Sequence, residues 1–574
     1  MCSRRVFCLF VAILLGVNVT AQQYAYQVSF IDKKGSSSIT TPSLFLSARA
    51  LNRRAAQGIA IDSTDVPVSP LYLDSVLTAT NGILHVTSKW LNMCVILVTD
   101  TTNIPSLRSK SFVTGVKQVA YYSTFLHYKS SGPQYSPVTA QGQLTPFTPS
   151  SSYYGQTYPQ TALVNGDYLH DNGYQGQGKL IAVLDAGFID ADVHSTTNLH
   201  PGFDSLVYAG GFVDAYNFTL DTSYVFDYDT HGLSSLSTIA GYKPGGIGSD
   251  TGYVGSAPLA QYAIYVTEDD NSEQPIELDN LVAGTERADS IGADVVSVSL
   301  GYDTFDDADY NFNFSTDFDG KSTITARAAN FATKKGMLFV ASAGNEGGGV
   351  PGWGHYILTP GDADSAITIG AVDLTGVNPS FSGYGPNAAG QVKPDVCLLG
   401  VATSVFHSGG LIVKEDGTSF STPQLAGWAA CLWQAAGSAA TPYMIRNAIN
   451  RSADHYTNVG PQIGYGVPDF QKAFQILDVK DTPNSSSASS VWVVAEGNPF
   501  TNTIGLAVKV PVKSDVDFVL TDLSGKKIIS ITKTFYPGWN PRISLPVPGS
   551  LPAGIYILHA ISSTQQQVVK MVKE

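Results

Sequence analysis

The sequence predicts an α/β protein in which helices cover both faces of a central parallel sheet. Apolar runs of strand length occur at residues 180–184, 262–266, 295–300, 337–342 and 367–372. Helix-like segments separate these runs, for example residues 281–291 and 324–333. Strands that are apolar on both faces and joined by helical crossovers form parallel sheets buried between helices. In such sheets the active site lies at the carboxyl ends of the strands.

Length, charge and the first residues limit the class of protein. The chain has 574 residues, too many for one ordinary domain, and its formal net charge of -14 argues against a nucleic-acid binder. Residues 1–21 contain Arg4 and Arg5 followed by an apolar run, which predicts a cleavable secretory signal. A membrane anchor is the alternative, but the run is short for a span. No later stretch reaches spanning length, so we expect no stable membrane span.

Residues 22–122 predict a small α+β unit. Strands are expected at residues 24–31, 83–90, 94–98 and 113–121, and helices at residues 42–57 and 71–80. The first helix has an apolar side, with Arg49, Arg53 and Arg54 opposite. Residues 123–157, rich in Ser, Thr, Pro and Gln, then predict an exposed linker of the kind that proteases cut.

The rest of the chain divides into the α/β unit, residues 158–479, a short linker, residues 480–490, and a last unit, residues 491–574. Seven short alternating runs with turn signals between them predict that the last unit is a β-sandwich. Outside the signal, Cys94, Cys397 and Cys431 each lie in an apolar context, which favours buried thiols over a disulfide or a metal site.

Four polar residues of the α/β unit stand where chemistry is expected. Asp185 ends an apolar strand, His231 precedes a helix-forming segment, and Asn345 follows another buried strand. Ser419 precedes the apolar run 424–436 and would lie at a helix N-terminus among unpaired backbone N–H groups, with Pro423 in the first turn. Each residue taken alone is more typical of a turn or a helix cap.

Together, the four residues resemble the subtilisin-like serine proteases (subtilases), whose catalytic residues occur in the order Asp, His, Ser. The resemblance rests on six stretches: Ile181-Ala-Val-Leu-Asp185-Ala-Gly187, Thr230-His231-Gly232, Ser299-Leu300-Gly301, Ala341-Ser-Ala-Gly-Asn345, Lys393-Pro394-Asp395 and Gly417-Thr-Ser419-Phe-Ser-Thr-Pro423. The residues after His231 depart from the family's usual pattern, but His194, His200 and His355 have no matching context.

The resemblance implies a subtilisin-like fold and a role for each residue. Ser419 would be the nucleophile, His231 the general base, and Asp185 the residue that orients the imidazole. The side chain of Asn345 and the backbone N–H of Ser419 would form the oxyanion hole, where the Asn contributes about 3–4 kcal/mol. Residues 299–301 (Ser299, Leu300 and Gly301) would bind an extended protein or peptide substrate as an added β-strand.

The resemblance also assigns roles to the flanking units. Residues 22–122 are similar to a subtilase propeptide, which assists folding, inhibits the cleft and is cleaved off. The last unit, with Asn498-Pro-Phe500 and Leu551-Pro-Ala-Gly-Ile-Tyr-Ile-Leu558, looks like the sorting domain that engages the type nine secretion machinery of the outer membrane in Bacteroidetes. A generic Ig-like accessory domain is the alternative. The product would be secreted or displayed at the cell surface.

No organic cofactor is required by this chemistry. The acidic insert at residues 302–320 could hold calcium, but it lacks a recognisable ligand spacing, so a solvated loop is favoured and no metal ligand is assigned. Two other functions stay open: a catalytically inactive surface-binding or adhesion protein, and a hydrolase acting on a non-peptide ester or amide.

Overall fold

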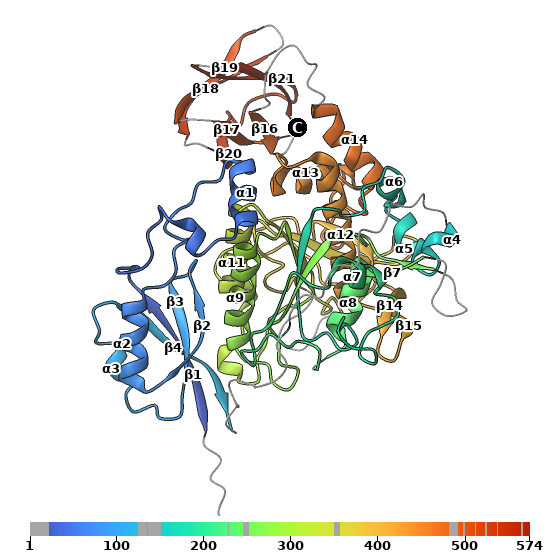
Figure 1. Ribbon diagram of the computed structural model, residues 1–574. Coiled ribbons are helices and arrows are strands. Elements are labelled where there is room, and N and C mark those ends of the chain that lie inside the picture. Colours follow the sequence, from blue (N-terminus) through green and yellow to red (C-terminus); the bar gives the residue numbers. More distant parts are fainter. Residues whose placement is uncertain are drawn as a thin grey trace, which may run out of the picture.

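A computed structural model shows three parts (Figure 1). It describes residues 22–123, 135, 151–227, 229–244, 252–348, 356–481, 492–496, 500–510, 513–522, 525–535, 538–563 and 566–573. The signal segment, the 480–490 linker apart from its first two residues, and His355 lie outside the described residues. Within them, no helix combines the length and hydropathy needed to cross a bilayer.

The central part contains the predicted parallel sheet. Its order is β13-β12-β11-β10-β5-β9-β6, with β5 Leu180–Asp185, β6 Asp214–Asn217, β9 Gln261–Val266, β10 Val295–Val298, β11 Leu338–Ser342, β12 Ile367–Val372 and β13 Val396–Leu399. All five predicted strands are present, and β6 and β13 complete the sheet. Every residue of β5 is buried, as expected for a strand covered on both faces.

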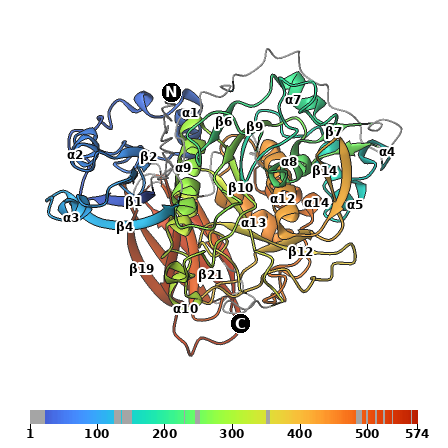
Figure 2. The ribbon, with the colours of Figure 1, turned by 90° about the horizontal axis from the view of Figure 1, so that it is seen from below.

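Alternate residues of β5 face two separate cores. Ile181 and Val183 pack with α8 His231–Ala240, α12 Thr418–Ala436 and their neighbours on one face. Leu180, Ala182 and Leu184 pack with α9 Ile276–Ile291 and α11 Ile324–Lys334 on the other. Figure 2 shows the helices on either side of the sheet.

Further elements surround this core. They are α4 Ser151–Tyr154, α5 Tyr158–Ala162, α6 Asp167–Asp171, α7 Asp204–Ala209, β7 Tyr242–Lys243, β8 Tyr253–Val254, η2 Ala308–Tyr310, α10 Phe314–Asp317, β14 Thr403–His407, β15 Leu411–Glu415, α13 Pro442–Ser452 and α14 Phe470–Asp481. One prediction is wrong here: the end of the 123–157 segment is not exposed. Tyr154 is fully buried, and its hydroxyl pairs with His170 Nδ1 at 2.8 Å.

The N-terminal part is a four-stranded antiparallel sheet, β2-β3-β1-β4, with β1 Gln23–Phe30, β2 Ile83–Ser88, β3 Met93–Val98 and β4 Val113–Tyr122. One face is covered by α2 Pro70–Thr80 and α3 Ile104–Leu107. The other face packs on α9 and α11, where Trp90, Val95 and Leu97 share a core with the central part.

The predicted helix 42–57 is two elements, η1 Pro42–Leu44 and α1 Ala48–Gln57. The chain breaks at Ser47, whose extended backbone and side chain cap α1 by accepting from the N–H of Ala50. Arg53 and Arg54 are not on a solvent face but are buried against α9.

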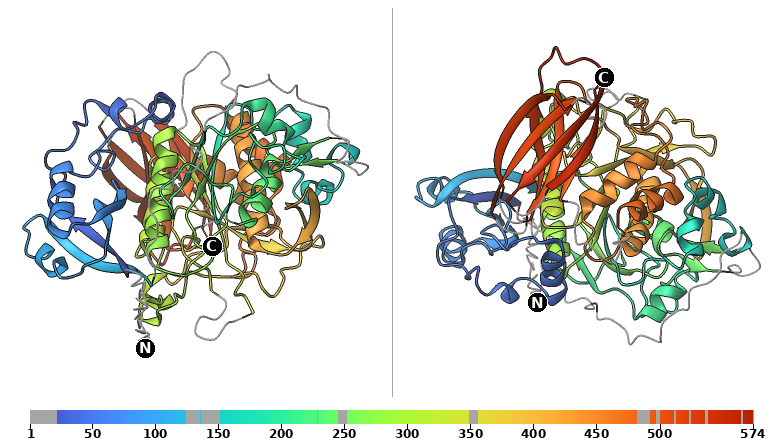
Figure 3. Two further views of the ribbon diagram at one scale, coloured as in Figure 1. Left: turned by 60° about the horizontal axis from the view of Figure 1, so that its bottom comes forward. Right: turned by 90° about the horizontal axis from the view of Figure 1, so that it is seen from above.

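The C-terminal residues form two antiparallel sheets that share one hydrophobic core, β16-β17-β20 and β19-β18-β21-β22. The strands are β16 Val493–Glu496, β17 Thr503–Val510, β18 Ser514–Asp522, β19 Lys527–Phe535, β20 Gly538–Pro546, β21 Gly554–Ser562 and β22 Gln566–Lys573. All seven predicted strands are present, most of them longer than expected. Figure 3 shows these sheets as a body distinct from the central sheet. Cys94, Cys397 and Cys431 are free, buried thiols, as predicted.

Candidate active site

Asp185 and His231 meet at the carboxyl edge of the central sheet. Asp185 ends β5 and is fully buried. Its Oδ1 accepts from the N–H of Ala186 at 2.9 Å and lies 2.6 Å from Nδ1 of His231. Because Nδ1 is held by the carboxylate, Nε2 is the ring nitrogen available for proton transfer. The predicted pairing of these two residues is therefore present in the structure.

Two glycines allow this close approach. A Cβ on Gly187 would lie 2.3 Å from the backbone nitrogen of Asp229, and a Cβ on Gly232 would lie 2.2 Å from the carbonyl oxygen of Gly187. The turn after Asp185 and the start of α8 thus touch backbone to backbone. Asp229 fixes the histidine further, since its Oδ1 accepts from the N–H of His231 at 2.5 Å.

Electrostatics favour the charged form of His231. Burial lowers its pKa, but the charge and hydrogen bond of Asp185, with smaller contributions from Asp229 and Asp270, outweigh burial and raise the pKa to about 9. The imidazole is thus a strong proton acceptor once it is neutral, and its cation is well stabilised.

Ser419 lies in the first turn of α12 and is largely buried, with 8% of its surface exposed. The ring of the next residue, Phe420, has its centroid 5.9 Å from that of His231, which places the start of α12 beside the histidine. In this structure the Ser419 hydroxyl donates to the carbonyl oxygen of Ser299 at 3.3 Å.

The position of Pro423 differs from the prediction. Because α12 begins at Thr418, Pro423 lies in the second turn, inside the helix. It has no N–H to donate to the carbonyl four residues earlier, which is that of Ser419. The hydroxyl of Ser299 donates to this carbonyl instead, at 2.9 Å. Ser299 therefore ties the helix that carries Ser419 to the end of β10.

Asn345 follows β11 and faces the same helix terminus. Its Oδ1 accepts from the backbone N–H and the hydroxyl of Thr418, both at 3.0 Å. This anchor turns the amide so that Nδ2 is left as a donor. The backbone N–H of Ser419, in the first turn of α12, has no intrahelical acceptor.

The rival histidines are engaged elsewhere. His194 pairs with Asp192, and His200 stacks on Phe406 with its Nε2 3.0 Å from the carbonyl oxygen of Leu411.

A cleft of about 640 Å³ lies at this edge and is lined by His231 and by Ser299, Leu300 and Gly301. That residues 299–301 bind the substrate stays a prediction. The sequence reasoning missed the other wall of the cleft, which contains Glu268, Asp269, Asp270 and Glu273. A signal was present, because residues 268–270 come one residue after the end of a predicted strand.

Three carboxylates of this region, Glu268, Glu273 and Glu277, have oxygens within 4.8 Å of one another. Both oxygens of Glu277 already accept backbone N–H groups, from Asp269 at 3.1 Å and Gln274 at 3.2 Å. Within the described residues, the aspartates of the 302–320 insert form no such group.

Comparison with known proteins identifies the family. The family model described as the subtilase family (peptidase S8) matches residues 176–467. The chain belongs to the subtilase family. A second model, the Bacteroidota peptidase S8 propeptide domain, matches residues 25–133. The predictions of a subtilase domain with a propeptide, and of a serine endopeptidase by family, are thus confirmed.

Relatives agree with this assignment. The chain is 30% identical over 324 residues to the thermophilic serine proteinase of Bacillus sp. (strain AK1), covering 56% of this chain and 67% of that protein. It is 28% identical over 313 residues to subtilisin DY of Bacillus licheniformis, covering 54% of this chain and 96% of that protein. It is 30% identical over 302 residues to the thermostable alkaline protease of Halalkalibacterium halodurans, covering 52% and 69%.

Proposed function

We propose that this subtilase is an exported endopeptidase that cleaves peptide bonds with Ser419, His231 and Asp185. The observation that carries the proposal is the 2.6 Å contact between His231 Nδ1 and the buried Asp185, beside the helix terminus that holds Ser419. An acid, an imidazole and a hydroxyl in this arrangement activate the hydroxyl as a nucleophile. The chemistry requires no organic cofactor.

The reaction proceeds in two displacements. Rotation of the Ser419 side chain away from the Ser299 carbonyl turns its Oγ toward His231 Nε2, which takes the proton as Oγ bonds to the scissile carbonyl carbon. The tetrahedral oxyanion accepts hydrogen bonds from Asn345 Nδ2 and the Ser419 N–H. His231 then protonates the leaving amine as the C–N bond breaks, and water repeats the sequence to release the acid product.

The cleft supports an extended peptide as the substrate. It is open to solvent, and one edge is the 299–301 segment that follows β10. An extended chain can pair its backbone with such an edge. A hydrolase for small esters would need a closed pocket, and the cleft is not one.

The test is covalent labelling with a fluorophosphonate probe. We expect the processed wild type to gain one label by intact mass, and Ser419→Ala to gain none and to retain its N-terminal region. Ser421→Ala is the matched control, because that hydroxyl donates to the Thr418 carbonyl within α12. If a folded, propeptide-free wild type takes up no label, the chain is a binding or adhesion protein and the proposal fails.

We further propose that the C-terminal unit is an Ig-like sandwich that directs export through the outer-membrane type nine secretion machinery. Its support is the seven-strand, two-sheet arrangement and the C-terminal sequence. Removing residues 491–574 should leave active enzyme in the periplasm; unchanged export of the truncated chain would contradict the proposal. The enzyme is then secreted or held at the cell surface.

A further inference from the structure

One wall of the cleft is strongly acidic. Six carboxylates line the cleft: Asp229, Glu268, Asp269, Asp270, Glu273 and Asp306. The described residues that line it include no lysine or arginine. The wall starts next to His231, where Asp229 accepts from the histidine N–H, and extends to Asp306, whose Oδ2 accepts from the N–H of Glu273 at 3.2 Å.

The carboxylates of this wall repel one another, and burial together with the charge of Glu273 raises the pKa of Glu268 to about 8. No described lysine or arginine forms an ion pair with any of the six carboxylates. Burial and the hydrogen bond and charge of Asp229 raise the pKa of Asp270 to about 6, and burial with the charges of Asp303, Asp306 and Asp270 raises that of Glu273 to about 7. A cation placed here would relieve this repulsion.

The end of the propeptide lies close to this wall. At the end of β4 the backbone N–H of Tyr121 donates to Gln274 Oε1 at 2.7 Å, directly beside Glu273. The last residues of β4 therefore lie next to the acidic wall. Downstream of this contact, from residue 122 to residue 166, the sequence has no Asp or Glu and contains Lys129. This stretch is complementary in charge to the wall.

We propose that the acidic wall selects substrates that carry a lysine or arginine on the N-terminal side of the scissile bond. The side of the bond follows from the propeptide, which precedes the mature enzyme in the chain and approaches past Gln274. This inference rests on the proposed peptidase activity. A long basic side chain can extend from the substrate backbone beside His231 and place its charge among the carboxylates.

A bound metal ion explains the wall less well. Of the three clustered carboxylates, Glu277 is 1% exposed and uses both oxygens on backbone N–H groups. Asp270 lies outside that cluster, nearer to His231, and is solvent-exposed where a substrate would pass.

The test is a digest of a mixed peptide library by the purified, processed full-length chain, with every cut mapped by mass spectrometry. The library is also digested by Ser419→Ala as a blank, by the double variant Asp270→Asn/Glu273→Gln, and by Asp309→Asn. Asp309 is the matched control, since it is an exposed aspartate of the same loop as Asp306 but does not line the cleft.

We expect Lys and Arg to be enriched at one or more of the positions just before the cut. For each carboxylate that is converted to an amide, the ratio of kcat/KM for a basic peptide to kcat/KM for a neutral peptide should fall about tenfold. Added salt should also weaken the preference for basic peptides. Asp309→Asn should retain the preference for basic peptides.

Cleavage without basic enrichment, or enrichment that is unchanged in the double variant, overturns the inference but leaves the proposed peptidase activity intact. If the double variant loses calcium-dependent thermal stability instead, the wall binds a metal ion and the inference is also wrong. No cleavage by a folded, propeptide-free chain rejects the proposed function itself.

Discussion

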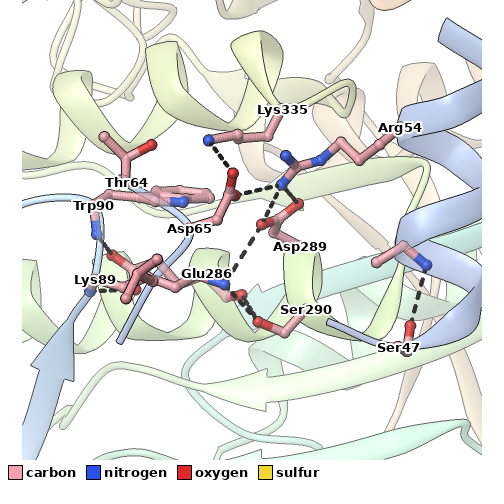
Figure 4. Close-up of polar contacts among 12 residues, drawn as sticks. Ser47, Arg54, Thr64, Asp65, Lys89, Trp90, Glu286, Asp289, Ser290 and Lys335 are labelled. Carbon is pink, nitrogen blue, oxygen red and sulfur yellow. Dashed lines mark hydrogen bonds and ion pairs between the residues drawn. The ribbon is translucent and has the colours of Figure 1, made fainter. Parts of the chain in front are cut away.

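Asp289 of α9 is predicted to hold the propeptide on the enzyme. Its side chain is fully buried and pairs with Arg53 at 2.5 Å, with Arg54 at 2.8 Å and with Lys89 at 3.6 Å, three cations that all belong to the propeptide (Figure 4 shows the pairs with Arg54 and Lys89). Asp289→Asn would leave the buried Arg53 guanidinium without its ion-pair partner and would leave Arg54 with Asp65 alone, at 3.0 Å. Removing one partner of a buried ion pair costs about 3–5 kcal/mol, or about two to three and a half orders of magnitude in affinity.

A matched control lies on the same helix. Asp279 is also buried under the propeptide, but among the described residues its only side-chain hydrogen bond is from the neutral amide of Gln27, at 2.7 Å. Burial raises the pKa of Asp279 to about 7. Asp279→Asn keeps an acceptor for Gln27 and removes the cost of burying a charge. It should therefore leave propeptide binding unchanged or tighten it.

The assay is inhibition of the processed enzyme by wild-type propeptide, residues 22–123, added in trans. The same propeptide is used throughout, so its own folding cost cancels. The inhibition constant should rise about a hundredfold or more for Asp289→Asn and should not rise for Asp279→Asn. Equal weakening by both substitutions, or no effect of Asp289→Asn, would refute the reasoning.

Three further outcomes are expected. Because catalysis needs neutral His231, kcat/KM should rise with pH, with a midpoint of about 9. Asp270→Asn should move that midpoint to lower pH, because the Asp270 carboxylate stabilises the imidazolium. A midpoint that is the same in Asp270→Asn would contradict this. Ser299→Ala leaves the Ser419 carbonyl unpaired and should lower the free energy of unfolding by about 1–3 kcal/mol in denaturant titration. Adding Pro423→Ala should regain part of that free energy, because it restores a backbone N–H that can donate to the Ser419 carbonyl. Asn345→Leu should reduce kcat by about a hundredfold to a thousandfold with little change in KM, measured on one peptide substrate.

The sequence was sufficient to predict an element where its residues depend on local neighbours, and to predict a site where a motif fixes the geometry. Runs such as residues 180–184 could be predicted as strands because both faces of that strand are buried. Asp185 and His231 could be paired only through the motif, since nothing local indicates that the turn at Gly187 touches Gly232. The break at Ser47 was missed because capping by a serine within a helix-forming stretch depends on the contact with α9, where Ser47 N–H donates to the Ser290 carbonyl at 2.8 Å.

Charged residues were the least predictable part. Arg53 and Arg54 have the spacing of a solvated helix face, yet they are buried because Asp289, which is more than two hundred residues away in the chain, supplies the counter-charge. The acidic wall was missed for the related reason that the loop between β9 and α9, which supplies four of its carboxylates, meets Asp229 from before α8 and Asp306 from the 302–320 insert only in the folded chain. Amphipathic periodicity describes one element at a time and carries no information about a partner from another unit.

Helix α9 links the propeptide to the cleft. Its middle and last turns hold the propeptide: the carboxylate of Glu286 accepts from the backbone N–H groups of Lys89 and Trp90, and Asp289 binds the arginines (Figure 4). Just before its first turn, Gln274 binds the end of β4 beside Glu273 of the acidic wall. The same rigid element thus sets both where the propeptide docks and where its downstream chain meets the cleft. Weakening the Asp289 contacts should therefore slow the first cleavage as well as loosen the cleaved propeptide, whereas changing Asp270 should affect the cleavage alone.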